Sequence, residues 1–297
     1  MRSGEPPELV DVIMFNDEVD MLRFRLNLHA PVASTFVVVQ SNLTFSGKPK
    51  ELYAQRILDE AVASDQVRQR RIVLTVPTPP TPAHTPWDRE RFQRTFLLKW
   101  LQRHYADHWV HLADVDELLD PQAVRQLLLA HDAFTREHLS ARASRRDCMS
   151  PMLRSFYYGE ACPKGLWMRS LLFHTASSFF AAAVRAGVEL RFTTSPSRLI
   201  HDHCTPSEVL LGWHLSFASD TDGILRKLRG FSHAYDPGVR ALLGLPNVTA
   251  VIDDRVRHCV DVLGRPTKKK YQGVVHSAFD GKLPWLPGWP RHPLAPR

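Results

Sequence analysis

Two aspartates one residue apart, Asp114 and Asp116, are the side chains of this sequence whose spacing best suggests chemistry. They directly follow a strand-like segment, residues 108–112, so both carboxylates are expected at the end of one strand, within reach of a single hard cation. Mg²⁺ and Mn²⁺ prefer one or two protein carboxylates together with phosphate oxygens of a substrate. A cation held in this way stabilises negative charge on a leaving diphosphate. The pair therefore predicts a metal site that binds a diphosphate.

The Asp-x-Asp pair has two other interpretations. Most acidic pairs in a basic protein are solvated loop residues or helix caps, and Asp116 stands just before Pro121, where a helix is expected to begin. Phosphatases of the haloacid dehalogenase type also place Asp-x-Asp after a strand. In those enzymes the strand lies near the chain start and Thr or Val follows the second Asp by two residues, whereas Leu118 stands there in this chain. Ligands of α/β folds bind beyond the carboxyl ends of strands, which favours the metal interpretation.

The segments around the pair alternate between strand and helix. Runs rich in β-branched residues predict strands over 9–15, 35–39, 71–76 and 108–112, and later over 151–158, 166–173 and 188–193. Helical spacing of apolar residues predicts helices over 18–29, 88–104 and 121–130, and five prolines within 77–86 predict a loop. This rhythm predicts an α/β fold with a mostly parallel sheet flanked by helices. We expect one domain over 9–282, between a tail at 1–8 and an extended or disordered proline-rich tail at 283–297.

Composition narrows the partners only slightly. The 297 residues carry a formal charge of +7, which attracts polyanions in general, but no basic stripe interleaved with aromatic residues suggests nucleic acid. The four cysteines never form a Cys-x-x-Cys pair, which favours buried or free thiols, although two disulfides in an oxidising lumen remain open. No window approaches the roughly 20 apolar residues of a membrane span, so the chain as given reads as soluble.

Four blocks of the sequence are distinctive: residues 11–26; residues 36–53 with Thr-Phe-Ser-Gly-Lys-Pro-Lys; residues 87–94 with Asp-Val-Asp-Glu at 114–117; and Gly-Trp-His-Leu-Ser-Phe at 212–217 with 227–228 and 231–233. Together they resemble glycosyltransferase family 17, the β-1,4-mannosyl-glycoprotein β-1,4-N-acetylglucosaminyltransferases that add the bisecting sugar to N-glycans. The chain departs from the family at Gln40, where Glu is expected, in the proline loop, and over 161–198. The resemblance implies a GT-A-like fold, a UDP-GlcNAc donor, Mn²⁺ or Mg²⁺, a glycan or glycoprotein acceptor and a Golgi or other secretory lumen, with the cytoplasm as the alternative.

The resemblance also assigns roles in a metal site. Asp116 is expected to bind the metal directly, and Asp114 to contact it through water or to contact the donor ribose. Many GT-A enzymes complete the site with a histidine late in the chain, for which His214 is the first candidate and His233 the second. Glu117 either orients donor or acceptor hydroxyls or forms a structural ion pair.

The remaining candidates concern the donor and the catalytic base. Asn16, Glu18 and Ser41 follow the first two expected strands, which suits uridine and ribose contacts, with helix capping as the alternative for Asn16 and Glu18. An inverting transfer needs a base near the acceptor hydroxyl. The other candidates are Lys48, Lys50 and Arg94 for the diphosphate, Asp202 and Glu208 for the base, and Trp213 and Tyr157 for stacking on sugar rings, with solvated charges and aromatic core packing as their alternatives.

The sequence thus predicts a metal-dependent inverting transferase that moves N-acetylglucosamine to a mannose hydroxyl in protein N-linked glycosylation. Two alternatives remain: a transferase with another donor sugar or a non-N-glycan acceptor, and a carbohydrate-binding homologue that has lost turnover.

Overall fold

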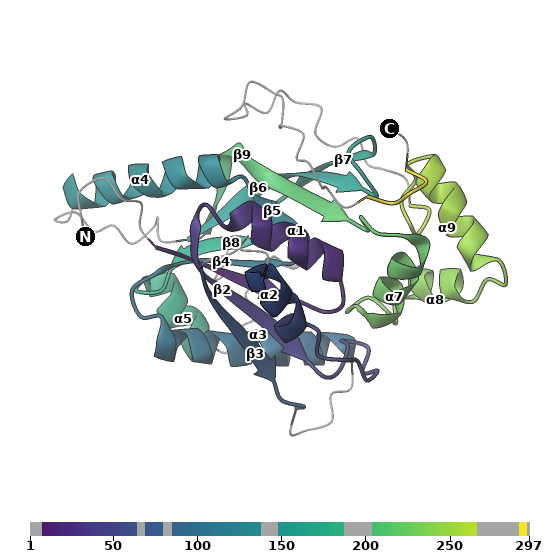
Figure 1. The fold of residues 1–297 in the computed structure, drawn as a ribbon, viewed down its shortest axis with the longest axis horizontal. Coiled ribbons are helices and arrows are strands. Elements are labelled where there is room, and N and C mark those ends of the chain that lie inside the picture. The colour runs from purple at the N-terminus through teal and green to yellow at the C-terminus, as the bar shows by residue number, and fades with distance from the viewer. Residues whose placement is uncertain are drawn as a thin grey trace.

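The computed structural model describes residues 8–63, 69–79, 85–137, 148–186, 204–265 and 291–295. In this part of the chain nine strands form one sheet, ordered β3-β2-β1-β4-β8-β6-β9-β5, with β7 paired to β6 (Figure 1). The strands are β1 Leu9–Met14, β2 Ala33–Ser41, β3 Arg70–Val76, β4 Trp109–Asp114, β5 Glu117–Leu119, β6 Cys148–Tyr157, β7 Pro163–Trp167, β8 Leu171–His174 and β9 Cys204–Ser216. The helices are α1 Val19–His29, α2 Ala54–Ala63, α3 Pro86–His104, α4 Pro121–Glu137, α5 Ser178–Ala186, α7 Thr221–Gly230, α8 Pro237–Leu243 and α9 Val248–Arg257.

The fold class is α/β, as predicted, but the sheet is mixed. β3, β2, β1 and β4 are all parallel, and β6 is parallel to β9. The pairs β4–β8, β6–β8, β6–β7 and β5–β9 are antiparallel. The prediction of a mostly parallel sheet is therefore right for β1 to β4, where a helix connects each strand to the next, whereas β6 turns directly back into β7 and the two pair antiparallel.

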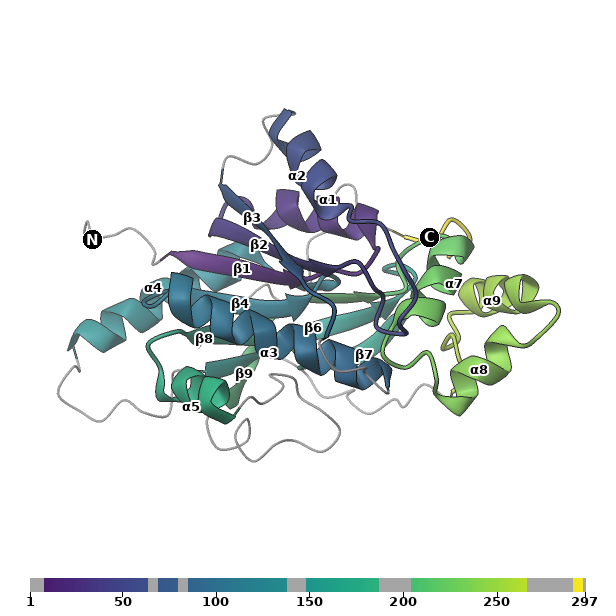
Figure 2. The same ribbon diagram turned by 90° about the horizontal axis from the view of Figure 1, so that it is seen from below.

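Helices cover both faces of the parallel half. β1 is buried along its whole length, which explains why its sequence is apolar apart from Asp11. Figure 2 shows α1 and α2 above the sheet and α3 and α5 below it, while α7, α8 and α9 gather at one end. Two apolar clusters match these layers: Ile13 and Val38 pack with α1 and α2, and Val12 and Val39 pack with α3 and α5.

All four cysteines form disulfides, Cys148–Cys204 and Cys162–Cys259. The preference for free thiols was therefore wrong. The spacing of the cysteines in the sequence does not indicate these pairs. Cys148 and Cys204 are 56 residues apart and meet because β6 and β9 lie side by side. The second bridge ties the β6–β7 turn to the end of α9.

Other expectations need correction too. The strand predicted over 166–173 is two strands, β7 and β8, and the strand predicted over 188–193 lies outside the described residues. The described part of the carboxyl-terminal tail, 291–295, is not extended: it turns and packs, with His292 donating its backbone N–H to the carbonyl of Tyr158 at 2.7 Å. No described helix is both long and apolar enough to cross a membrane.

The pairing of β5 with β9 depends on a glycine. A Cβ added at Gly212 would lie 2.0 Å from the carbonyl oxygen of Leu118 and 2.8 Å from Cα of Leu119. Backbone on the neighbouring strand cannot yield as a flexible side chain can. The β5–β9 contact therefore tolerates no side chain at this position.

We predict that Gly212→Ala lowers the free energy of unfolding by about 1–3 kcal/mol, the usual cost of overpacking, measured by chemical denaturation. Gly238→Ala is the matched control, because a Cβ at this helical position meets nothing within 4 Å. Equal stability of the two variants would contradict the close approach of β5 and β9.

Candidate active site

The two aspartates stand in the turn between β4 and β5, at the carboxyl edge of the parallel strands. Asp114 is the last residue of β4 and lies in register with Met14 at the end of β1. Asn16 and Glu18 follow β1 and therefore reach the same edge. The turn is the position at which α/β folds bind ligands.

Asp114 is held from α3. Nη2 of the buried Arg94 lies 2.7 Å from its Oδ1, and Nε of the same guanidinium lies 3.0 Å from Oε1 of Glu90. The hydroxyl of Ser232 donates to the other oxygen of Glu90. The side chain of Asp114 is 28% exposed. Arg94 therefore orients Asp114 from beneath instead of offering its charge to a diphosphate.

Glu117 closes the turn. Its Oε2 accepts a hydrogen bond of 2.8 Å from the backbone N–H of Asp114, and its Oε1 accepts one from the indole N–H of Trp167. The ring of Trp167 stacks on that of His214, with centroids 4.0 Å apart. Glu117 thus joins the acidic turn to β7 and β9, a structural role that the sequence left open beside a substrate contact.

Asp116 faces two basic side chains. Nζ of Lys227 lies 2.6 Å from its Oδ2 and 3.3 Å from Oε1 of Glu18. Nε2 of His214 lies 3.8 Å from its Oδ1, and Nδ1 of that ring is 3.1 Å from the hydroxyl of Ser155. Burial opposes the charge of Lys227, but the carboxylates of Asp116 and Glu18 outweigh it and raise its pKa. The ammonium is therefore strongly bound to the acidic turn.

Helix capping, the alternative interpretation, does not describe the side chains of Asp116 and Glu18. Asp120, not Asp116, accepts the N–H of Ala123 at 2.9 Å at the start of α4. Glu18 occupies the N-cap position of α1 but makes no side-chain capping hydrogen bond.

A cleft of about 660 Å³ opens over the turn. Its floor includes both aspartates and His214. Its walls come from distant parts of the sequence: Asn16 from the first loop, Trp167 from β7, and Val262, Leu263 and Arg265 after α9. The other polar or aromatic lining residues are Glu18, Phe45, Trp87, Glu90, Arg91, Lys164, Arg169, Ser216, Phe217, Lys227, Phe231, Ser232, His233 and Asp236.

Several predicted donor residues lie away from this cleft. Lys48 is exposed in a turn, and Ser41 is buried, where its hydroxyl accepts the N–H of Leu43. The ammonium of Lys50 donates to the carbonyls of Phe15 and Asn16, and burial lowers its pKa to about 8. These lysines therefore shape the first loop instead of facing the acidic pair.

The described candidates for the catalytic base and for stacking on sugar rings also lie away from the cleft. Glu208 is exposed on β9, six residues before His214, and Asp202 lies outside the described residues. Trp213 and Tyr157 are buried in apolar clusters, so core packing, the alternative, is correct for both. His233 lines the cleft, with Nδ1 at 2.6 Å from Oδ2 of Asp236.

Sequence reasoning gave no role to Lys164, Trp167 and Lys227. Trp167 and Lys164 fall in the region that matched the family poorly, and Lys227 lies over 100 residues beyond the acidic pair. Burial lowers the pKa of Lys164 to about 8, and its ammonium lies 4.2 Å from the ring centroid of Tyr157. Only the folded chain shows that β7 and α7 face the turn.

The model of glycosyltransferase family 17 matches residues 2–144, which include the acidic turn, α3 and the loop after β1. The matched part is just under half of the chain, and over it the chain is similar to glycosyltransferase family 17. The matched region carries the Asp-x-Asp side of the cleft, while the wall made by β7, β9 and α7 lies beyond it.

A comparison with solved structures finds one described as "Crystal structure of a glycosyltransferase involved in the glycosylation of the major capsid of PBCV-1". It is 9% identical, with a TM-score of 0.26, over 61% of this chain and 63% of that one. This chain therefore spans less than two thirds of that protein. A comparison with curated proteins returned no match.

Beneath the acidic turn lies a buried ion pair. Arg25 on α1 donates from Nη2 to Oδ1 of Asp11 at 2.6 Å and from Nε to Oδ2 at 3.1 Å. Its Nη1 donates to the carbonyls of Asp114 at 2.7 Å and Glu117 at 2.8 Å. One guanidinium thus links β1 and α1 to the backbone on both sides of Asp116.

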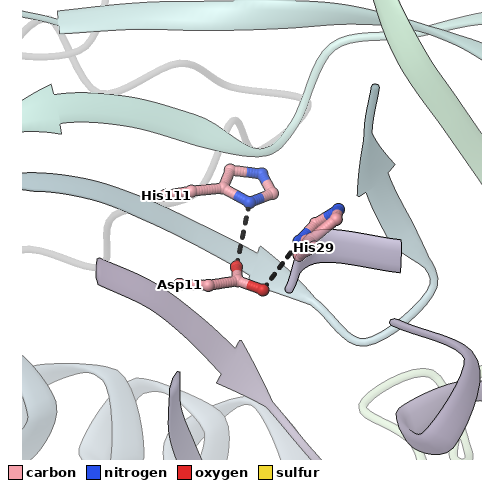
Figure 3. A group of neighbouring side chains, drawn as sticks. All are labelled: Asp11, His29 and His111. Atoms are coloured by element: carbon pink, nitrogen blue, oxygen red, sulfur yellow. Dashed lines mark hydrogen bonds and ion pairs between the residues drawn. The ribbon is translucent and has the colours of Figure 1, made fainter. Parts of the chain in front are cut away.

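Two histidines complete the cluster (Figure 3). Nδ1 of His29 lies 2.7 Å from Asp11, and its Nε2 accepts the N–H of Leu119 at 3.0 Å. Nδ1 of His111 lies 3.1 Å from both Asp11 and Arg25. Asp11, His29 and His111 are spaced closely enough to hold a metal ion, but Arg25 already supplies the cation and both nitrogens of His29 are engaged. The cluster is therefore a support for the turn and not a metal site.

We predict that Arg25→Met lowers the free energy of unfolding by about 3–5 kcal/mol, because it leaves the carboxylate of Asp11 buried without its cation. Chemical denaturation measures this loss. Arg23→Met on the same helix is the control: its pair with Glu60 is exposed, so the expected loss is below about 1 kcal/mol. Similar losses in both variants would show that the buried pair has no special role.

The cluster also predicts a pH dependence. Burial lowers the pKa of His111 from 6.5 to about 4, so between these values the unfolded chain binds a proton that the folded chain does not. Stability is therefore lost as the pH falls through this window. His111→Gln should reduce the stability difference between pH 7 and pH 5 by about 2 kcal/mol, measured by denaturant titration at each pH. An unchanged difference would contradict the assignment.

Proposed function

We propose that this protein is a metal-dependent, inverting glycosyltransferase that moves N-acetylglucosamine from UDP-GlcNAc to a mannose of an N-glycan in a β-1,4 linkage. The observation that carries the proposal is the Asp114-x-Asp116 turn on the floor of the cleft, at the carboxyl edge of β1 and β4. The choice of donor sugar, acceptor and linkage follows the resemblance to the family.

The donor set of the cleft suits Mn²⁺ or Mg²⁺. Asp114 and Asp116 offer carboxylate oxygens, and His214 offers an imidazole on the same floor. Such ions commonly take one or two protein carboxylates and complete their shell with substrate phosphate oxygens. A metal held here would stabilise charge on the leaving diphosphate. In this proposal Arg94 orients Asp114, and Glu117 fixes the turn.

The walls of the cleft suit the two substrates differently. Asn16 and Glu18 border the acidic pair on the β1 side, which favours donor contacts. Trp167 on the opposite wall offers an aromatic face flanked by Lys164 and Arg169, whose charged groups lie 5.6 Å and 5.0 Å from its ring centroid. Because the Trp167 ring also stacks on His214, the charged groups of Lys164 and Arg169 are the hydrogen-bond donors of this wall, and we assign the β7 wall to the acceptor hydroxyls.

The disulfides support a secretory compartment. Disulfides persist in oxidising environments and are rare in the cytosol. One bridge joins β6 to β9 and the other joins the β6–β7 turn to the end of α9, so a lumen such as that of the Golgi suits the folded enzyme.

The test is calorimetric titration of UDP-GlcNAc into the protein with and without Mn²⁺, beside Asp116→Asn and the Asp114/Asp116 double alanine variant. We predict that binding requires Mn²⁺ and that Asp116→Asn lowers the rate of transfer at least about 100-fold, since the charge that holds the metal is lost. Asp222→Asn, an exposed carboxylate on α7, is the control and should retain wild-type behaviour.

Other results would select the alternatives. Metal-dependent binding of a different nucleotide-sugar would replace the donor, and glycan binding without any donor turnover would identify a carbohydrate-binding homologue. Full transfer activity of Asp116→Asn would refute the metal assignment.

A further inference from the structure

We propose that Lys227 is an exchangeable counter-cation of the acidic turn: it neutralises Asp116 until a divalent ion takes that carboxylate, and then it binds the donor's diphosphate. This inference rests on the proposed metal dependence. It predicts that metal and nucleotide bind cooperatively and that this cooperativity depends on the side chain of Lys227.

The contacts of Asp116 are the first support. Its carboxylate is 7% exposed, and Oδ2 is the oxygen that the ammonium of Lys227 contacts at 2.6 Å. Oδ1 faces Nε2 of His214 at 3.8 Å. A divalent ion that binds Asp116 must therefore displace the ammonium or lie beside it. Two cations at this distance repel strongly in a partly buried site.

Glu18 gives the ammonium a second partner. Its Oε1 lies 3.3 Å from Nζ of Lys227. Glu18 stands in the loop after β1, whereas Asp116 stands in the turn between β4 and β5. The lysine can therefore leave Asp116 without leaving a buried charge unpaired, which would be costly. Exchange thus needs only a change of rotamer in a long side chain.

The surroundings leave room for that movement. Lys227 is 19% exposed and lines the cleft over the acidic turn. Together with Glu18, Asp116 and Phe217 it also lines a second cleft of about 830 Å³ between α1 and α7. The side chain therefore stands where the two clefts meet, next to the position that a diphosphate bound to a metal at Asp116 would occupy.

The test measures Mn²⁺ binding without nucleotide, by calorimetry or from the spin-resonance signal of free Mn²⁺. Lys227→Met should bind Mn²⁺ about tenfold more tightly than the wild type, because the competing charge is gone. Lys227→Arg keeps the charge and should resemble the wild type. Arg229→Met removes one charge from the exposed face of the same helix and is the matched control.

A second titration adds UDP at saturating Mn²⁺. Lys227→Met should bind UDP about tenfold more weakly than the wild type, because the diphosphate has lost a cation. Thermal melting of each variant confirms that it is folded before titration.

The outcomes separate this inference from the proposed function. Equal Mn²⁺ affinity in the wild type and Lys227→Met, or unchanged UDP affinity, would overturn the exchange while leaving metal dependence intact. If the wild type binds UDP equally tightly in the presence of a chelator, metal dependence is refuted. If Lys227→Met binds UDP more weakly under those conditions, the lysine is a permanent replacement for the metal.

Discussion

The geometry of the acidic turn depends on the ion pair between Arg25 and Asp11. The guanidinium uses one side to bind the carboxylate on β1 and the other to bind the carbonyls of Asp114 and Glu117. Both side chains are completely buried, so neither can exchange its partner for water. Because an unpaired charge at this depth is costly, β1, α1 and the turn are constrained to one relative arrangement. This constraint fixes the positions of the carboxylates in the cleft.

A second layer of contacts acts from the other elements. Arg94 on α3 fixes the side chain of Asp114, while Glu117 links its backbone to Trp167 on β7. The carboxylate of Asp116 instead faces the basic groups of Lys227 and His214. Of the two aspartates, Asp114 is thus the more rigidly oriented, and Asp116 is the one whose partners a bound cation would change.

The sequence predicted the parallel half of the fold well, because β1, β2 and β4 are almost wholly buried and are rich in apolar residues. It also placed Asp114 and Asp116 at a strand end, which the register with β1 confirms. It failed where local signals are weak: β5 has three residues, and β9 has no alternation that marks its 13 residues as one strand. Arg94 and Lys48 show the limit for single residues, since sequence identifies a cation but not whether its charge is already paired.

The Cys162–Cys259 bridge has a consequence for how the cleft forms during synthesis. Val262, Leu263 and Arg265, beyond α9, line the cleft, and the bridge fastens this region to the β6–β7 turn. A chain that has emerged from the ribosome only as far as α4 already carries both aspartates, yet it lacks β7, β9 and α7. Since domains fold from the amino terminus during synthesis, the parallel half can form before the opposite wall of the cleft exists. The cleft is therefore complete only after the residues beyond α9 have been made and the second bridge has been oxidised.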